Sequence, residues 1–147
     1  MTFAIEREGV NELPISPLLE PGSAEYRPGV CNIGPAEISR RRRAGITGIA
    51  AAAILAGGLV VAGAPDWSRW LVALPLAGGT VGLLQARLRF CAAYGFSGVS
   101  NFGPLGRASL VAGEAERRAD RRRAAQISLV SAAVGVAGAA VLVALPV

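Results

Sequence analysis

Three long apolar stretches without a charged residue divide the sequence, at Ala44–Ala64, Trp70–Ala86 and Ala124–Val147. A helix needs about 20 mostly apolar residues to cross the hydrocarbon core of a bilayer. Backbone N–H and C=O groups in lipid must be paired within their own segment, as they are in a helix. The alternation of apolar and polar residues that is typical of β-barrel strands is absent. The pattern predicts an all-α integral membrane protein with three transmembrane helices, at about residues 44–64, 70–90 and 124–145.

The arginines beside these stretches predict how the helices are oriented. They precede the first stretch (Arg40, Arg41, Arg42, Arg43), follow the second (Arg87, Arg89) and precede the third (Arg107, Arg117, Arg118, Arg121, Arg122, Arg123). Only the short loop Pro65–Arg69 lacks an arginine excess. Because cytoplasmic loops retain positive charge, we expect a multi-pass protein of the bacterial cytoplasmic (inner) membrane, with its N-terminus in the cytoplasm and its C-terminus outside. We assign Arg40, Arg41, Arg42, Arg43, Arg121, Arg122 and Arg123 to topology and to contact with anionic headgroups of membrane lipids.

The polar segments divide into a tail and a loop. Residues 1–39 are rich in glutamate and interrupted by prolines, which predicts an extended cytoplasmic tail. Its frequent apolar residues favour a tail that is ordered on a partner protein or on the inner loop. Residues 40–147 form the predicted membrane domain, with a cytoplasmic loop at 92–123. From Glu114 the sequence favours a helix that extends the third span, and we interpret it as a solvated stem rather than a docking surface.

Composition limits the chemistry that the chain can perform. It has 147 residues, 52% of them hydrophobic, with a net charge of +5 and no histidine. Too few residues remain outside the spans for a separate catalytic domain of ordinary size. The apolar stretches hold no ionisable residue, so the usual signature of a proton relay is missing. We therefore expect no enzymatic activity, no cofactor and no metal site. Since the positive-inside pattern explains the arginines, we also expect no nucleic-acid partner.

Small residues recur one helical turn apart in each predicted span. The spacings are Ala53-xxx-Gly57, Gly78-xxx-Gly82 and Ser131-xxx-Gly135-xxx-Ala139. Such faces let helix backbones approach each other in lipid, so they predict a compact bundle or an oligomer. Thr47, Thr80, Gln85, Ser128 and Ser131 are candidates for lining a passive pore, although hydroxyls in membrane helices more often bond their own backbone.

Two cysteines, Cys31 and Cys91, fall on the predicted cytoplasmic side. Thiols are kept reduced there, so we do not expect a structural disulfide. Arg43, Arg87 and Arg89 are candidates for lowering the pKa of a nearby thiol, which makes Cys91 a candidate reactive thiol. A small buried or interfacial residue is the simpler interpretation.

Two segments stand out at the borders of the first two spans. One is Cys31-Asn32-Ile33-Gly34-Pro35, followed by an acid and the arginines before the first span; the other is Arg89-Phe90-Cys91-Ala92-Ala93-Tyr94-Gly95 at the end of a Trp-led span. Together they resemble a family of small two-span bacterial inner-membrane proteins of unassigned function. The resemblance covers about residues 31–103. Some members are fused to a rhodanese (sulfurtransferase) domain, which implies dimerisation through the spans and a role in handling sulfur compounds. This chain has Ala92 where the family often has proline, lacks the rhodanese domain, and adds the tail and a third span.

Two hypotheses for function follow. The first is a non-catalytic membrane subunit that packs within or stabilises a membrane protein complex or homo-oligomer. The second is a small transporter or sulfur carrier that uses Cys91 at the cytoplasmic mouth. The absence of buried charge from the predicted spans favours the first.

Overall fold

A computed structural model describes residues 26–146 of the chain. Its elements are α1 (Pro35–Val61), the 3-10 helix η1 (Asp66–Val72), α2 (Ala73–Leu88), α3 (Ala92–Ser97), β1 (Val99–Ser100), β2 (Ser109–Leu110) and α4 (Glu114–Ala144). Three helical segments are long and apolar enough to cross a membrane: Pro35–Val61, Asp66–Leu88 and Glu114–Ala144. The predicted all-α class with three spans is confirmed.

Local sequence signals explain where α1 begins and ends. Pro35 occupies the first turn, where its fixed φ suits a helix and its missing N–H costs nothing. At the other end Gly63 has a φ of +58°, a left-handed conformation that glycine adopts without strain, and Pro65 follows it. The helix therefore includes residues 35–39, which the sequence assigned to the tail, and all four consecutive arginines.

Helix α4 begins at Glu114, where the sequence predicted a helical extension ahead of the third span. Gly113 precedes α4, and its N–H donates to Glu116 Oε2 at 3.2 Å. This contact is the reciprocal half of a capping box, and acids in the first turn also suit the positive end of the helix dipole. Helix α4 consequently continues the span well beyond its apolar part.

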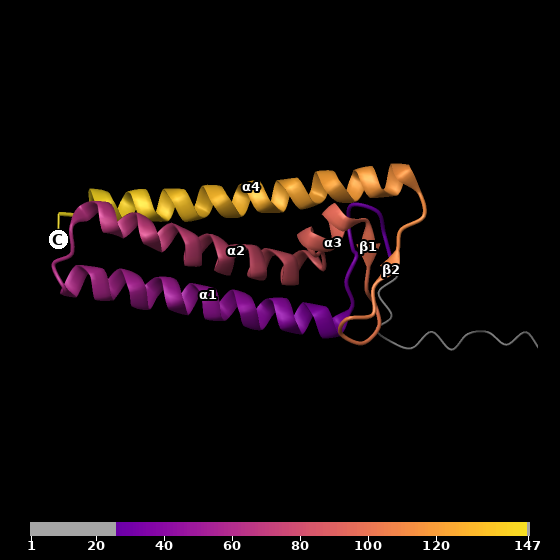
Figure 1. Cartoon of the computed structure of the whole chain (residues 1–147), viewed down its shortest axis with the longest axis horizontal. Coiled ribbons are helices and arrows are strands. Elements are labelled where there is room, and N and C mark those ends of the chain that lie inside the picture. The colour runs from indigo at the N-terminus through magenta and orange to yellow at the C-terminus, as the bar shows by residue number, and fades with distance from the viewer. Residues whose placement is uncertain (1–25, 147) are drawn as a thin grey trace, which may run out of the picture.

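Helix α2 lies between α1 and α4 and packs against both (Figure 1). We call the end of the bundle that carries Arg40–Arg43 and Arg87 the arginine end, and the end that carries Trp67 and Trp70 the tryptophan end. Only 11% of the most apolar window of α1 and 22% of that of α4 is buried within the chain. Most of the apolar surface of both outer helices is therefore available to lipid or to another protein.

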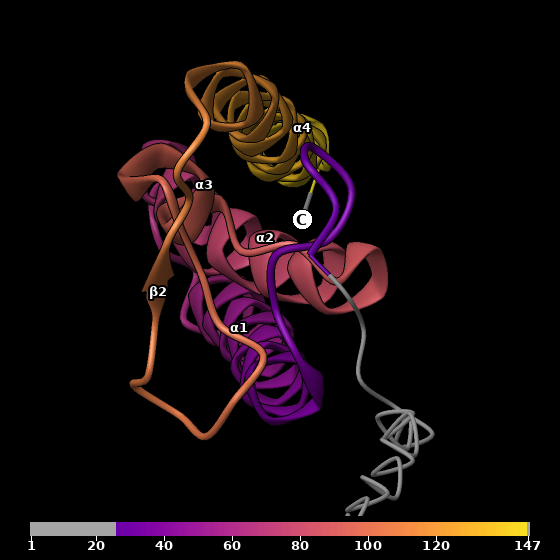
Figure 2. The ribbon, with the colours of Figure 1, turned by 90° about the vertical axis from the view of Figure 1, so that its right-hand side faces the viewer.

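A small cap of irregular structure closes the arginine end. It consists of residues 26–34 and 89–113, and includes α3 and a two-stranded antiparallel ribbon in which Val99 faces Leu110. Figure 2 shows residues 26–34 rising beside α4 and returning to the start of α1. Phe90 and Ala92 of the cap form a buried apolar cluster with Ala124 and Ile127 of α4, and Val81, Leu84 and Leu88 of α2 pack against it. The cap is thus anchored to both α2 and α4.

Candidate functional site

The side chain of Asn32 joins the tail segment to the end of α2. Its Oδ1 accepts from the Cys91 N–H at 2.6 Å, and its Nδ2 donates to the Cys91 carbonyl at 3.1 Å. Its backbone N–H donates to the Arg89 carbonyl, and its carbonyl accepts from the Asn101 N–H. Asn32 is completely buried, so these bonds satisfy an amide that would otherwise be costly to remove from water. Residues 31–35 and residues 89–95, far apart in the sequence, meet at this contact.

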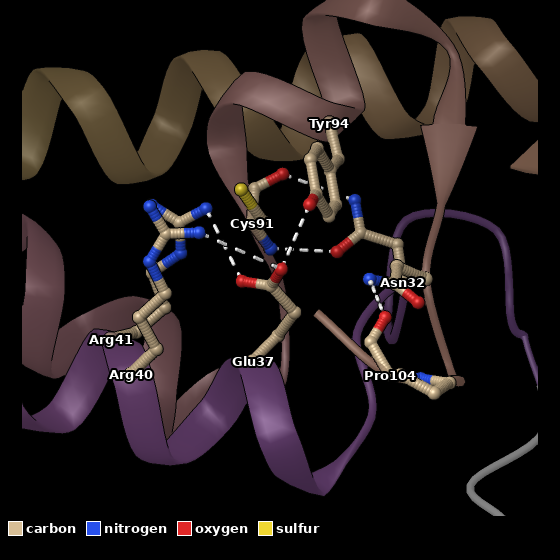
Figure 3. Close-up of polar contacts among 8 residues, drawn as sticks. Asn32, Glu37, Arg40, Arg41, Cys91, Tyr94 and Pro104 are labelled. Carbon is tan, nitrogen blue, oxygen red and sulfur yellow. Dashed lines mark hydrogen bonds and ion pairs between the residues drawn. The ribbon is translucent and has the colours of Figure 1, made fainter. Parts of the chain in front are cut away.

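A buried carboxylate lies one turn into α1, beside the contact between Asn32 and Cys91, which we call the Asn32 clasp. Glu37 is fully buried, and its Oε1 accepts from the Tyr94 hydroxyl at 2.9 Å (Figure 3). The guanidinium of Arg41 lies 3.6 Å from Glu37 Oε2 and 5.9 Å from the centre of the Tyr94 ring. Arg40 approaches the same carboxylate at 4.0 Å. Burial and the hydrogen bond to Glu37 raise the pKa of Tyr94, so its hydroxyl remains a donor.

A second buried carboxylate holds the beginning of the described tail against α4. Asp120 accepts from the Tyr26 hydroxyl at 3.0 Å and from the Gly29 N–H at 2.7 Å. Burial and this hydrogen bond raise the pKa of Tyr26 above its ordinary value. The first part of α4, which we interpreted from the sequence as a solvated stem, is therefore a docking surface on the face that carries Asp120. It binds the chain's own residues 26–29.

Glycines bring the α1 and α2 backbones together. A Cβ atom built on Gly82 would lie 2.7 Å from Gly45 Cα, and one built on Gly48 would lie 2.6 Å from Gly79 Cα. Both distances are too short for a real Cβ contact. The two helices touch through paired glycines that are three residues apart on each helix, a close approach of the kind that membrane helices use.

Arg69 connects the tryptophan end to the C-terminus of α4. Its Nη1 donates to the carbonyls of Leu142 and Leu145 at 3.2 and 3.0 Å, and its Nη2 lies 3.1 Å from Asp66 Oδ1. The last carbonyls of a helix have no partner within the helix and carry partial negative charge. The buried guanidinium supplies both a donor and the opposite charge.

Among the grooves lined by described residues, two open on the surface of the arginine end. One lies between α1 and α2 and has a volume of about 580 Å³; its lining residues are Pro35, Ile38, Ser39, Arg42, Ala86, Arg87 and Arg89. It adjoins a hollow of about 400 Å³ that shares Ile38, Arg42, Ala86 and Arg87 and adds Leu83. We call the combined surface the α1–α2 groove. The other groove, of about 500 Å³, is lined mainly by α4, with Arg118, Arg122 and Arg123.

The predicted packing residues do not lie on a single contact. Ser131, Gly135 and Ala139 are buried, and a Cβ on Gly135 would lie 2.6 Å from the Ala73 carbonyl, so this face of α4 packs on α2. Gly82 is buried against Gly45. By contrast, Ala53, Gly57 and Gly78 are exposed. Nothing among the described residues lies within 4 Å of a Cβ built on Gly57 or Gly78.

The predicted topology arginines sit on the surface of the arginine end. Arg40, Arg42 and Arg43 are exposed, and Arg41 is half-buried against Glu37. Arg121 and Arg122 are exposed, whereas Arg123 is half-buried and donates to Gln126. Headgroups or solvent can therefore reach the exposed Arg42, Arg43, Arg121 and Arg122.

Both cysteines are buried and free of a disulfide. Cys91 has no exposed surface and Cys31 is 7% exposed, with its Sγ 3.9 Å from the Ile33 carbonyl. The candidate reactive thiol therefore contributes its backbone to the Asn32 clasp while its side chain is enclosed.

The candidate pore hydroxyls bond their own helices. Thr47, Thr80 and Ser131 donate to the carbonyls of Arg43, Leu76 and Ile127, each four residues earlier. Gln85 is buried in α2, and Ser128 is half-buried. The three hydroxyls are therefore satisfied locally, as is common in membrane helices.

Sequence reasoning missed the most enclosed polar groups, which are Asn32, Glu37, Asn101 and Asp120. The partners of Asn32, Glu37 and Asp120 lie 57 to 94 residues away along the chain, so no local pattern marked these contacts. The paired glycines did carry a signal, because Gly45-xx-Gly48 and Gly79-xx-Gly82 have the same spacing.

In comparisons with known proteins, no family model, curated protein or solved structure matches the chain. Its function must be inferred from its own residues.

Proposed function

We propose that the chain is a non-catalytic small integral membrane subunit that packs within, or stabilises, a membrane protein complex or a homo-oligomer. In this proposal it resides in a bacterial inner membrane, with the arginine end on the cytoplasmic side. Its partner is another membrane helix, which belongs to a second copy or to a different subunit.

The observation that carries the proposal is the presence of open glycines on apolar helical surface. Gly57, Gly58 and Gly78 are exposed, and nothing among the described residues lies within 4 Å of a Cβ built on any of them. Glycine in a helix costs about 1 kcal/mol relative to alanine. In this chain Gly45, Gly48, Gly79 and Gly82 offset that cost where a neighbouring backbone comes close. For Gly57 and Gly58, the cost would be offset in the same way only if a helix backbone from another molecule packed against them.

The neighbouring surface of α1 supports this reading. Ala53 lies one turn from Gly57 and is also exposed, so both belong to one smooth face. Lipid tails already satisfy apolar side chains, and small residues on a lipid-facing surface therefore gain nothing by themselves. The resemblance of residues 31–103 to small two-span proteins agrees with the proposal, since that family is expected to associate through its spans.

The alternative, a transporter or sulfur carrier that uses Cys91, has less support. Cys91 has no exposed surface, and neither the α1–α2 groove nor the α4 groove is lined by it. Three of the four hydroxyls considered for a pore, those of Thr47, Thr80 and Ser131, donate to carbonyls of their own helices. A thiol carrier needs an accessible thiolate.

The test is to isolate the full chain in mild detergent from its native membrane and to weigh it by native mass spectrometry. We expect a defined complex that contains a second copy or another membrane subunit. Gly57→Leu should remove the partner, because the new side chain occupies the surface on which the other backbone rests. Ala133→Leu places the same side chain on an exposed position of α4 and is the matched control.

A bare monomer under all mild conditions would contradict the proposal. So would equal loss of the partner in both variants, since that result would point to general instability. Loss of function in Cys91→Ser, with the complex still intact, would favour the thiol hypothesis instead.

A further inference from the structure

The α1–α2 groove combines an apolar floor with three arginines at one end. Leu83 and Ala86 of α2 and Ile38 of α1 supply the apolar surface. Arg42, Arg87 and Arg89 supply the charge. Since a helix rises 1.5 Å per residue, Leu83 lies about 6 Å further toward the tryptophan end than Arg87. Along α2 the groove therefore changes from charged to apolar in the direction in which an acyl chain would lie, whereas Ile38 precedes Arg42 on α1 and adds apolar surface at the charged end.

The three arginines have no acidic partner in the described chain. Within residues 26–146, the ion pairs are made by Arg40, Arg41, Arg69 and Arg118. Glu37, the acid nearest in sequence to Arg42, is buried on another side of α1, where it is engaged by Arg40 and Arg41. Positive charges gathered beside hydrocarbon repel each other unless an anion lies among them. The groove is therefore complementary to an anion.

The arginines of the α1–α2 groove lie, along the bundle axis, at the level of the headgroup layer of one leaflet. From Arg42 to Val61, α1 rises by about 28 Å, which is close to the thickness of about 30 Å of a hydrocarbon core. Trp67 and Trp70, exposed at the tryptophan end, suit the opposite interface. Arg42, Arg87 and Arg89 consequently lie at the level of the phosphates when the spans cross the bilayer.

We propose that the α1–α2 groove binds one anionic phospholipid, with its phosphodiester between Arg42, Arg87 and Arg89 and an acyl chain along Ala86 and Leu83. The apolar floor favours a lipid over a free phosphate, because a free anion leaves Leu83 and Ile38 uncovered. Basic pockets between membrane helices at the cytoplasmic side are typical sites for such headgroups. This inference is independent of whether the chain has a protein partner.

The test is native mass spectrometry of the full chain in mild detergent, titrated with phosphatidylglycerol and, separately, with phosphatidylcholine of the same acyl chains. We expect one phosphatidylglycerol to bind in preference to phosphatidylcholine. Arg42→Gln combined with Arg87→Gln should weaken that binding by about 30-fold, since each arginine near a charged headgroup contributes about a factor of five. Inorganic phosphate at millimolar concentration should not displace the lipid.

The matched control removes two arginines elsewhere. Arg107 and Arg121 are exposed and line neither groove, so Arg107→Gln with Arg121→Gln should retain the bound phosphatidylglycerol. Leu83→Asn should weaken the lipid adduct while keeping all three arginines. The inference is overturned if both lipids bind equally, if the control pair loses the lipid as the groove pair does, or if phosphate displaces it. Equal binding would also be the result if the acidic tail of the chain filled the groove.

Discussion

The side-chain amide of Asn32 pairs with both the N–H and the C=O of Cys91, as the backbone of an adjacent β-strand would. We expect Asn32→Ala to leave the buried Cys91 N–H unpaired, at a cost of about 1–3 kcal/mol, and to remove one of the two donors to the Cys91 carbonyl, which keeps its bond from the Gly95 N–H. The tail segment should then separate from α2 and uncover the thiols of Cys31 and Cys91. The rate at which a maleimide labels these thiols in detergent measures the effect.

Asn101→Ala is the control for this substitution. The amide of Asn101 bonds Gly103 and Pro104, within three residues, and also interacts with Tyr94, while its backbone holds the pairing with Asn32 and Gly34. Its loss should loosen one turn and leave the labelling rate nearly unchanged. Equal labelling of the two variants would show that Asn32 is not the residue that holds the tail.

The two tyrosines offer a pH test of the cap. Tyr26 and Tyr94 are the only tyrosines in the chain, and the pKa of each is raised above the ordinary value of 10.0 by burial and by a hydrogen bond to a carboxylate. A raised folded-state pKa means that the stabilisation is fully present below pH 10 and is lost as the pH rises through the folded value. Phenolate absorbance near 295 nm should therefore appear above pH 10 in the folded chain and around pH 10 in the denatured chain.

Glu37→Gln separates the two phenols. It removes a negative charge beside Tyr94, so the pKa of that residue should fall back toward 10, whereas Tyr26, held by Asp120, should be unaffected. If either tyrosine ionised near pH 10 in the folded, unmodified protein, the burial of the two phenols in the cap would be contradicted.

Among the contacts between helices, paired glycines determine how closely α1 and α2 pack. In Gly48→Ala the new Cβ would meet the Gly79 backbone at 2.6 Å, so the helices must separate. Overpacking of this kind costs about 1–3 kcal/mol. Gly58→Ala has nothing within 4 Å among the described residues, and alanine is the better helix former by about 0.8–1 kcal/mol. The free energy of unfolding of the dilute monomer in mixed micelles should fall in the first variant and hold or rise in the second. Equal changes would place the close contact elsewhere.

Arg69 should be the most sensitive position at the tryptophan end. Arg69→Gln removes the charged donor to the carbonyls of Leu142 and Leu145. We expect the free energy of unfolding to fall by about 2–4 kcal/mol, because hydrogen bonds from charged groups contribute about 1.5–3 kcal/mol each. Asp66→Asn removes an ion pair whose acid is 73% exposed, so its cost should stay below about 1 kcal/mol. The same unfolding measurement checks both. A larger effect from Asp66→Asn would mean that the ion pair, and not the helix end, is what Arg69 serves.

The elements were predictable from the sequence because each span is a long uninterrupted apolar run, and such a run has one low-energy structure in lipid. The cap was not predictable for the opposite reason. The sequence placed Glu37 in the extended tail and Asp120 in a solvated helical stem, and only their tertiary partners, Tyr94 and Tyr26, explain their burial. The small-residue faces were predicted at four-residue spacing, whereas the contact between α1 and α2 uses three-residue spacing.

At the scale of the whole molecule, charge is strongly asymmetric along the bundle axis. The arginine end carries the four arginines that open α1, together with Arg87, Arg89 and those of the α4 stem, whereas η1 at the tryptophan end carries Arg69 paired with Asp66. The cap and the α1–α2 groove lie at the arginine end, so both face the same leaflet. Any lipid or partner contact made there is coupled to the orientation of the spans.

Single cysteines at the two ends test that orientation. Because Cys31 and Cys91 are buried, they should give little background with a maleimide that does not cross membranes. Ala62→Cys lies in the exposed turn after α1, and Ser109→Cys lies in the exposed strand β2 of the cap. If positive charge stays in the cytoplasm, sealed cells should be labelled at position 62, and position 109 should react only after the membrane is opened. The reverse pattern would invert the topology and place the arginine-lined groove, with the lipid proposed for it, in the outer leaflet.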